Sequence, residues 1–194
     1  MLELETPHGI ARVRLEQAES PSAVVLGHGA GGGIDSPDLK GAAGAARDAG
    51  LSVALVEQPY RVAGRRSPAP AAQLDAAWVS VVAQLPFGGL ALIAGGRSSG
   101  GRVACRTAAE VGASAVLCLA FPVHPPGRPE KSRLDELDAV EVPTLVVQGE
   151  RDPFGLPPPG PRRTVVTVAG THSLRSSGTI AAVVSDWLTS LSVA

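Results

Sequence analysis

The sequence predicts an α/β fold, a three-layer α/β/α sandwich in which helices cover both faces of a mostly parallel β-sheet. Short, continuously apolar segments alternate with helix-length segments along the chain. Such apolar strands are typical of a parallel sheet that is buried on both faces. The 194 residues are 44% hydrophobic and 18% charged, which suits one hydrophobic core. We therefore expect a single domain over residues 1–194.

The first two predicted strands form an antiparallel hairpin. Residues 2–5 and 11–16 alternate apolar and polar side chains, and Pro7, His8 and Gly9 lie between them. The later strands are predicted at four apolar segments and at two further segments nearer the C-terminus. They are residues 23–26, 51–56, 90–94, 115–120, 144–147 and 164–168.

Helices are predicted between these strands. Ser36 can cap the first helix, with Pro37 in its first turn. The predicted helices are residues 37–50, 69–85, 99–111 and 176–191. In open sheets of this kind ligands bind at the carboxyl ends of the strands. We therefore expect the functional residues in the loops that follow the strands.

Composition and charge exclude several classes of function. A net charge of −1 argues against a duplex nucleic-acid partner, which requires a basic face. No apolar segment approaches the ~18 residues of a membrane helix, and the first residues do not resemble a signal peptide. We therefore expect no membrane partner and a cytoplasmic location. Cys105 and Cys118 fit no zinc module, so we expect no metal and no cofactor.

The most specific motif is Gly96-Arg97-Ser98-Ser99-Gly100, between a predicted strand and a predicted helix. It matches G-x-S-x-G, in which a nucleophilic serine lies on a sharp strand-to-helix turn. Side chains two residues before and after that serine would collide, so both positions must be very small. Ser98 has glycine at both positions, whereas Ser99 would have Arg97 at one of them. Ser98 is therefore the candidate nucleophile.

A serine hydroxyl is a poor nucleophile until a base removes its proton. His172 follows the last predicted strand and is the candidate base, whereas His8 precedes the serine and lies in the hairpin. Asp152 follows the strand at 144–147 and is the candidate acid that orients the imidazole. Glu150, in the same turn, is the alternative acid.

A glycine-rich loop at residues 27–33 follows the strand at 23–26. Acyl transfer requires backbone N–H groups that stabilise the developing oxyanion. The N–H groups of Ser99 and Ala30 are the candidates for this oxyanion hole.

Basic residues in the loops at this end of the sheet suggest how a substrate is bound. The candidate substrate-binding residues are His28, Arg61, His124 and Arg128, and the further basic residues are Arg65, Arg66, Lys131 and Arg151. A basic rim would favour a substrate with a carboxylate or phosphate. The chain is too short for an inserted lid domain, so we expect an open pocket.

The glycine loop also supports a different hypothesis, a dinucleotide-binding oxidoreductase. Gly27, Gly29 and Gly32 form G-x-G-x-x-G, and Glu57 ends the next strand, where such folds place a ribose-binding acid. The third glycine should open the helix, but residues 34–36 intervene. This hypothesis also leaves the ordered serine, acid and histidine unexplained.

With these motifs the chain resembles the α/β-hydrolase superfamily. More narrowly, it is similar to small hydrolases related to dienelactone hydrolase, a branch that includes testis-expressed α/β-hydrolase-like proteins and a subunit of a histone-acetyltransferase complex. The matching segments are residues 27–31, 35–37, 96–102, 124–131, 148–155 and His172. The resemblance implies a Ser-His-Asp triad that cleaves an ester, thioester or related acyl bond through an acyl-enzyme. The expected partner is a small-molecule acyl substrate.

The chain departs from this family pattern at three places. Ser99 stands where the family usually has Met, and Thr171 where it often has Asp. Residues 153–161 contain five prolines and replace a helix that the family has before the last strand. This shortened loop could hold Asp152 less firmly. It therefore motivates an alternative function, a catalytically weak or inactive interaction scaffold with the same fold.

Overall fold

An eight-stranded, mostly parallel sheet forms the centre of the computed structural model, which describes residues 1–191. The strand order is β1-β2-β4-β3-β5-β6-β7-β8. β1 and β2 form the predicted antiparallel hairpin, β2 pairs antiparallel with β4, and all the other neighbours are parallel. The strands are β1 (Leu2–Thr6), β2 (Gly9–Glu16), β3 (Ser22–Gly27), β4 (Ser52–Glu57), β5 (Ala91–Arg97), β6 (Ala113–Leu119), β7 (Thr144–Gly149) and β8 (Arg163–Val168).

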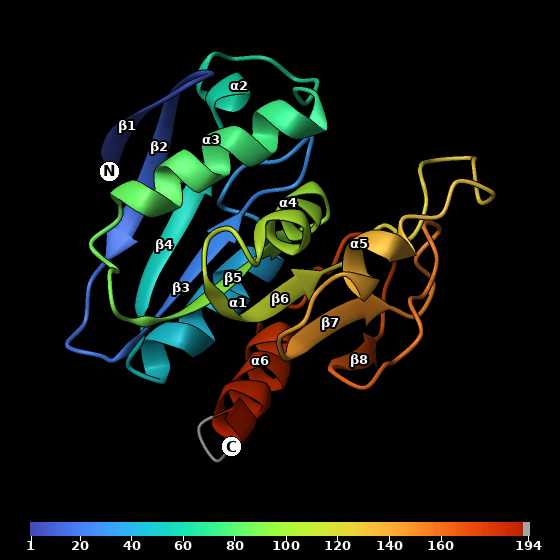
Figure 1. Cartoon of the computed structure of the whole chain (residues 1–194). Helices are drawn as coiled ribbons and strands as arrows, with labels where there is room; N and C mark the ends of the chain where they lie inside the picture. The colour runs from blue at the N-terminus through green and yellow to red at the C-terminus, as the bar shows by residue number, and fades with distance from the viewer. Residues whose placement is uncertain (192–194) are drawn as a thin grey trace.

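Helices cover both faces of this sheet, as the alternating pattern predicts (Figure 1). The helices α1 (Pro37–Asp48) and α6 (Ser177–Leu191) pack together on one face, and α3 (Ala71–Gln84) and α4 (Ser99–Thr107) lie on the other. The short helices α2 (Pro59–Val62) and α5 (Leu134–Asp138) were not predicted. With four and five residues, they are too short for helical periodicity to be visible in the sequence.

Each face of the sheet has its own hydrophobic core. Trp78 of α3 and Phe121 are fully buried in the first core, and Leu39 of α1 and Ile180 of α6 lie in the second. Full burial of such side chains contributes roughly 1.5–3 kcal/mol each to the free energy of folding. The central strands are therefore apolar because both faces of the sheet are buried, as predicted.

Two local predictions need correction. Ser36 does precede α1, but its side chain makes no capping hydrogen bond, and its Oγ is buried without a partner in the described part of the chain. The helix α4 ends at Thr107, before the predicted end at residue 111. The chain turns there through Gly112, whose φ of +66° suits glycine, and β6 begins at the next residue.

The carboxyl ends of β3, β5, β6, β7 and β8 lie at the same end of the sheet. Gly27 at the end of β3 is in register with Gly96 of β5, so the loops after these two strands start side by side. The loop after β6 extends away from the body of the molecule (Figure 1). Residues 150–162 join β7 to β8 without a helix, in agreement with their prolines.

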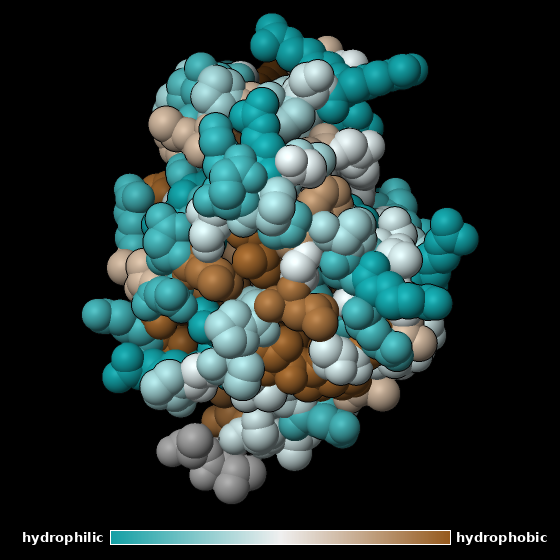
Figure 2. Space-filling model, turned by 90° about the vertical axis from the view of Figure 1, so that its right-hand side faces the viewer, coloured by the Kyte–Doolittle hydropathy of each residue, from teal (hydrophilic) through white to brown (hydrophobic). Residues whose placement is uncertain are grey.

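β8 is an edge strand of the sheet. Its Val165, Val166 and Val168 are only partly buried. Figure 2 shows this side of the molecule, with apolar residues in its lower middle and hydrophilic residues around them. Among residues 1–191, none of the helices combines the length and the apolar character that crossing a bilayer requires.

Candidate active site

Ser98 lies on a strained turn between β5 and α4. Its φ and ψ of 49° and −107° are rarely adopted by a residue with a side chain. Such a conformation costs roughly 1–3 kcal/mol and persists only where the surroundings impose it. Hydrogen bonds hold both sides of the turn, from the Ser98 N–H to the Leu119 carbonyl (2.8 Å) and from the Arg102 N–H to the Ser98 carbonyl (3.1 Å). The predicted turn is therefore present.

Gly96 and Gly100 are needed because this turn packs against the end of β3. A Cβ on Gly100 would contact the Gly27 carbonyl oxygen and would lie 2.5 Å from the Gly27 carbonyl carbon. A Cβ on Gly96 would also meet the Gly27 oxygen and would lie 2.8 Å from the Gly100 carbonyl carbon. The sequence motif predicted the two glycines, but the main obstacle is the backbone of β3, which the motif does not contain.

The structure brings Ser98, His172 and Asp152 together. The His172 Nε2 lies 2.9 Å from the Ser98 Oγ, and the His172 Nδ1 lies 2.9 Å from the Asp152 Oδ2. The side chain of Asp152 is fully buried, and that of His172 is 17% exposed. The rings of Phe154 and His172 pack edge to face, with their centroids 4.4 Å apart. The hydroxyl, the imidazole and the carboxylate thus form one continuous hydrogen-bonded chain.

Asp152 is held firmly, although the loop that follows it is short and rich in proline. The buried amide of Gln148 donates from Nε2 to the Asp152 Oδ2 (2.8 Å), and the Phe154 N–H donates to Oδ1 (2.8 Å). The same Nε2 lies 2.9 Å from the carbonyl oxygens of Phe121 and Gly155. The alternative acid, Glu150, is exposed. Asp152 therefore lies after β7, as predicted, and Gln148, which was not predicted to take part, supports it.

The glycine loop after β3 is fixed by hydrogen bonds to its carbonyl groups. The Gly29 oxygen lies 2.8 Å from the His28 Nδ1 and accepts the Gly32 N–H at 3.1 Å. The Tyr60 hydroxyl donates to the Ala30 oxygen at 2.8 Å. In a trans peptide the N–H points opposite to the carbonyl, so the bonds to Gly29 set the direction of the Ala30 N–H.

A pocket of about 450 Å³ lies beside this chain of three residues. Its wall contains Ala30, Ser98, Ser99 and His172, together with Phe154. Its volume suits a small organic ligand. The two predicted oxyanion-hole residues and the predicted nucleophile therefore line one cavity.

None of the four residues predicted to bind substrate lines this pocket. His28 is 2% exposed, and its Nε2 accepts the Gln58 N–H at 3.0 Å. Burial lowers the pKa of His28, which favours the neutral ring that these two hydrogen bonds require. His28 therefore shapes the glycine loop and does not line the pocket.

The other three residues point elsewhere for local reasons. Arg61 donates to the Arg65 carbonyl at 3.3 Å, and the His124 Nδ1 lies 2.9 Å from the Pro125 oxygen. Arg128 is exposed in the loop that extends from the body of the molecule. The basic residues in the pocket wall are instead Arg97, Arg102 and Arg133. The order of residues in a loop does not determine which side chain turns inward.

Two of the residues that were missed had a signal in the sequence. Arg102 lies four residues after Ser98 on a predicted helix, so the two share a face. Gln148 is a polar residue at the end of an apolar strand, which is unusual inside a sheet. Arg133 lies in a long loop and had no comparable signal.

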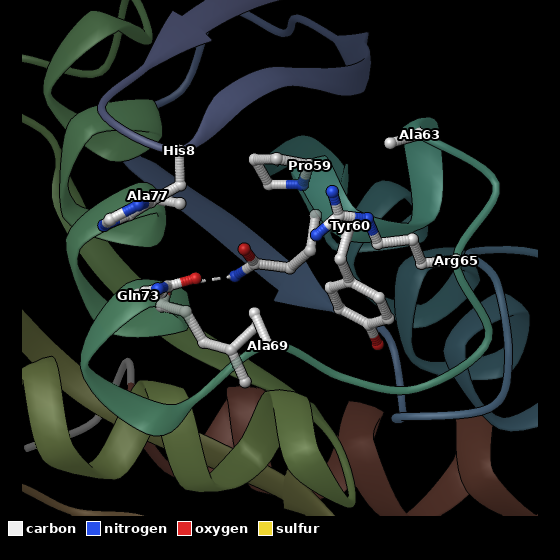
Figure 3. Close-up of a pocket in the computed structure, with 10 residues that line it drawn as sticks. His8, Pro59, Tyr60, Ala63, Arg65, Ala69, Gln73 and Ala77 are labelled. Atoms are coloured by element: carbon white, nitrogen blue, oxygen red, sulfur yellow. Dashed lines mark hydrogen bonds between the residues drawn. The ribbon is translucent and has the colours of Figure 1, made fainter.

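A second, smaller cavity lies between α2, α3 and the turn that joins β1 to β2. It measures about 80 Å³ and is lined by His8, Gln73 and Ala77 on one side and by Pro59 and Tyr60 on another (Figure 3). This volume is too small for the substrates expected from the sequence. The cavity is therefore not a second substrate site.

The dinucleotide hypothesis and a metal centre receive no support from the described residues. Gly32 lies outside any helix, and α1 begins only at Pro37, whereas the third glycine of a dinucleotide fingerprint should open the helix. Within residues 1–191, no three His, Cys, Asp or Glu side chains are grouped so that they could hold a metal ion.

Comparisons with known proteins bear on the family and on the fold. A family model described as "Alpha/beta hydrolase domain" matches residues 20–174. No curated protein matches the chain by sequence.

Solved structures with the same fold cover nearly the whole chain. One is an alpha-beta serine hydrolase homologue from Coxiella burnetii (14% identity, 96% of each chain, TM-score 0.77). A second is an α/β serine hydrolase without lid from Xanthomonas campestris (22% identity, 98% of this chain and 93% of that one, TM-score 0.75). A third is a dienelactone hydrolase from Anabaena variabilis (20% identity, 97% and 95%, TM-score 0.71). These likenesses show the fold.

Proposed function

The chain belongs to the alpha/beta hydrolase domain family, and on this premise we propose that it is a serine hydrolase that cleaves a carboxylic ester, thioester or related acyl bond. One observation carries the proposal: the Ser98 hydroxyl, the His172 ring and the buried Asp152 carboxylate form a continuous hydrogen-bonded chain at the wall of a substrate-sized pocket. This is the arrangement that activates a serine for acyl transfer.

In the proposed mechanism the Ser98 oxygen attacks the acyl carbon while the Nε2 of His172 takes the hydroxyl proton. Asp152 accepts the hydrogen bond from Nδ1 and stabilises the imidazolium that forms. The N–H groups of Ser99 and Ala30 donate to the oxyanion.

Breakdown of this intermediate gives the acyl-enzyme. The bond to the leaving group breaks, and His172 gives its proton to that group. Water then attacks the acyl-enzyme, with His172 again as the base, and the acid and the free Ser98 hydroxyl are released. The cycle uses no cofactor.

The proposal includes two finer points. The segments that resemble the dienelactone-hydrolase-related branch, with its testis-expressed and acetyltransferase-complex members, support a place for the chain in that branch. The two free cysteines, Cys105 and Cys118, support a cytoplasmic location, where thiols stay reduced.

Labelling with a fluorophosphonate probe and hydrolysis of p-nitrophenyl acetate test the function. Ser98→Ala should abolish both labelling and hydrolysis, and His172→Ala should abolish hydrolysis. Ser99→Ala is the matched control, because it removes the neighbouring hydroxyl but keeps the N–H group of the oxyanion hole. Labelling that survives Ser98→Ala contradicts the proposal. A folded wild-type protein that neither reacts with the probe nor hydrolyses the ester would instead support the interaction-scaffold alternative.

A further inference from the structure

Arginines are the charged neighbours of Ser98 in the pocket wall, and two of them are already paired with carboxylates. The Arg97 Nε donates to the Asp38 Oδ2 at 2.9 Å. Arg102 binds Glu136 through two hydrogen bonds, of 2.8 and 2.5 Å. Their charges are therefore largely compensated within the protein.

Arg133 differs from these two arginines. Its backbone N–H donates to the Val123 carbonyl at 2.7 Å, but within residues 1–191 its guanidinium makes no hydrogen bond and no ion pair. The side chain is partly buried and lines the pocket. A guanidinium carries five N–H donors in a planar fork. At the pocket wall these donors are free to bind an acceptor on a ligand.

The charges around Arg133 do not balance. Arg106 binds Asp75 (2.6 Å) and shares Glu136 with Arg102 (3.2 Å from Arg106). With Arg133 the cluster contains three guanidinium groups and two carboxylates, which leaves one positive charge beside the pocket. Burial and, after it, the nearby Arg102 lower the pKa of Arg133, and Glu136 acts in the opposite direction. No Asp or Glu of the described residues lines the pocket.

We propose that the acyl substrate carries a carboxylate away from the bond that is cleaved, and that Arg133 binds this carboxylate. The inference rests on the proposed function and narrows it to a class of anionic esters. The fork of a guanidinium matches the two oxygens of a carboxylate. The single excess positive charge favours a singly charged group over a phosphate monoester, which carries nearly two charges near neutral pH. Arg133 lies in the loop after β6 and Ser98 in the turn after β5, so the two residues line the same pocket from different segments.

Matched ester pairs that differ by one charge test this proposal. Mono-(p-nitrophenyl) adipate carries a carboxylate on the acyl side, and methyl p-nitrophenyl adipate is its neutral partner with the same leaving group. The pair 4-acetoxybenzoate and methyl 4-acetoxybenzoate places the carboxylate on the leaving side. We expect the wild-type protein to prefer the anionic member of one pair by roughly tenfold to a hundredfold in kcat/KM, the effect of a charge-assisted hydrogen bond. Added salt should reduce this preference.

Arg133→Gln should lower kcat/KM far more for the anionic ester than for the neutral ester, and so remove the preference. Arg128→Gln is the matched control, because Arg128 lies in the same loop but is exposed and outside the pocket. It should keep the preference. Equal rates for both members of both pairs in the wild-type protein overturn the proposal. An equal loss on both esters in Arg133→Gln also overturns it.

Binding without turnover separates this proposal from the proposed function. In the Ser98→Ala background, calorimetric titration with the preferred carboxylate ester should show binding that Arg133→Gln weakens by at least tenfold. If the wild-type protein hydrolyses no ester but this Arg133-dependent binding is present, the proposed function fails and the carboxylate site stands. If the Ser98→Ala protein binds charged and neutral esters equally, the carboxylate site fails.

Discussion

The serine turn and the acid–histidine pair meet at one pocket but are held by different kinds of contact. At the serine turn two backbone segments are in close contact, and Gly96 and Gly100 pack so closely against Gly27 of β3 that neither position has room for a side chain. At the other side, hydrogen bonds between side chains and backbone position Asp152 and His172. The first region is therefore fixed by shape and the second by a network of polar groups.

This difference teaches where the site can tolerate change. A steric contact between backbones cannot relax by rotating a side chain, so its loss should be abrupt. A hydrogen-bond network can lose one member and keep part of its geometry. The two regions are joined by Arg97, which precedes the serine and donates to the His172 carbonyl at 3.2 Å. A close contact also exists on the polar side, where a Cβ on Gly149 would lie 2.8 Å from the Thr171 carbonyl carbon.

Gly100→Ala should give the largest loss. The new Cβ meets the Gly27 carbonyl, so the strand or the turn must move, and we expect destabilisation of about 3 kcal/mol. Ester hydrolysis should fall below detection, because Ser98 leaves its position. Urea denaturation and p-nitrophenyl acetate hydrolysis measure the two effects.

Gly178→Ala is the matched control for that variant, because a Cβ on this helical glycine has nothing within 4 Å. It should be neutral or stabilising by roughly 0.5–1 kcal/mol. Full activity and stability in Gly100→Ala would show that the serine turn is not fixed by shape, and the comparison between the two regions would collapse.

Gln148→Met should give a smaller, graded loss on the polar side. It keeps the volume of the side chain but removes the donors to Asp152 and to the carbonyl of Phe121. Leaving these acceptors unpaired should cost about 1–3 kcal/mol of stability. We expect kcat to fall roughly tenfold to a hundredfold, as for the loss of one hydrogen bond to a charged group. KM should stay nearly constant, because Gln148 does not line the pocket.

Steady-state kinetics separate kcat from KM in this variant. The control is Gln73→Met, a change of the same kind at an exposed position on α3, which should leave both constants unchanged. A fall in kcat below detection, as expected for Gly100→Ala, would mean that activity is lost as abruptly by a change on the polar side as by a change at the serine turn. An unchanged kcat would mean that Asp152 does not depend on Gln148.

The sequence was sufficient for the parts of the fold that depend on local patterns. The apolar strands, the hairpin and the long helices follow from periodicity, and Pro37 marks the start of α1. The motif around Ser98 predicts its own turn, because strain and small neighbours are local requirements. Asp152 and His172 could be found because each directly follows an apolar strand whose carboxyl end must lie at the same end of the sheet.

The rest of the site depends on tertiary contacts that no local pattern contains. Arg133 reaches the pocket through the path of a long loop, whereas Arg128, five residues earlier, remains exposed. His28 stands beside the predicted oxyanion residue but turns inward, because the N–H of Gln58 from another strand end offers it a partner. Side-chain direction in loops is set by such distant partners, and these were the positions where prediction from the sequence was wrong or silent.

The glycine loop depends on both kinds of contact. The chain's one tyrosine, Tyr60, binds this loop, and its replacement should give the smallest of the effects predicted for the site. Its hydroxyl donates to the Ala30 carbonyl at 2.8 Å. Burial raises the pKa of Tyr60 from 10.0 to about 12, with Arg61 acting in the opposite direction. Between these two values the unfolded chain loses the phenolic proton while the folded protein keeps it. Stability from this group is therefore complete below pH 10 and declines as the pH rises toward 12.

Titration of the tyrosinate absorbance measures this directly, because no second tyrosine contributes. The midpoint should lie near 12 while circular dichroism still shows the folded protein. Tyr60→Phe should cost about 1 kcal/mol below pH 10, should remove this part of the alkaline decline in stability, and should reduce kcat only a few-fold, because the bonds to Gly29 remain. A midpoint near 10 in folded protein would mean that the hydroxyl is open to water. Only the contacts of the Gly29 carbonyl, with the His28 Nδ1 and the Gly32 N–H, would then fix the direction of the Ala30 N–H.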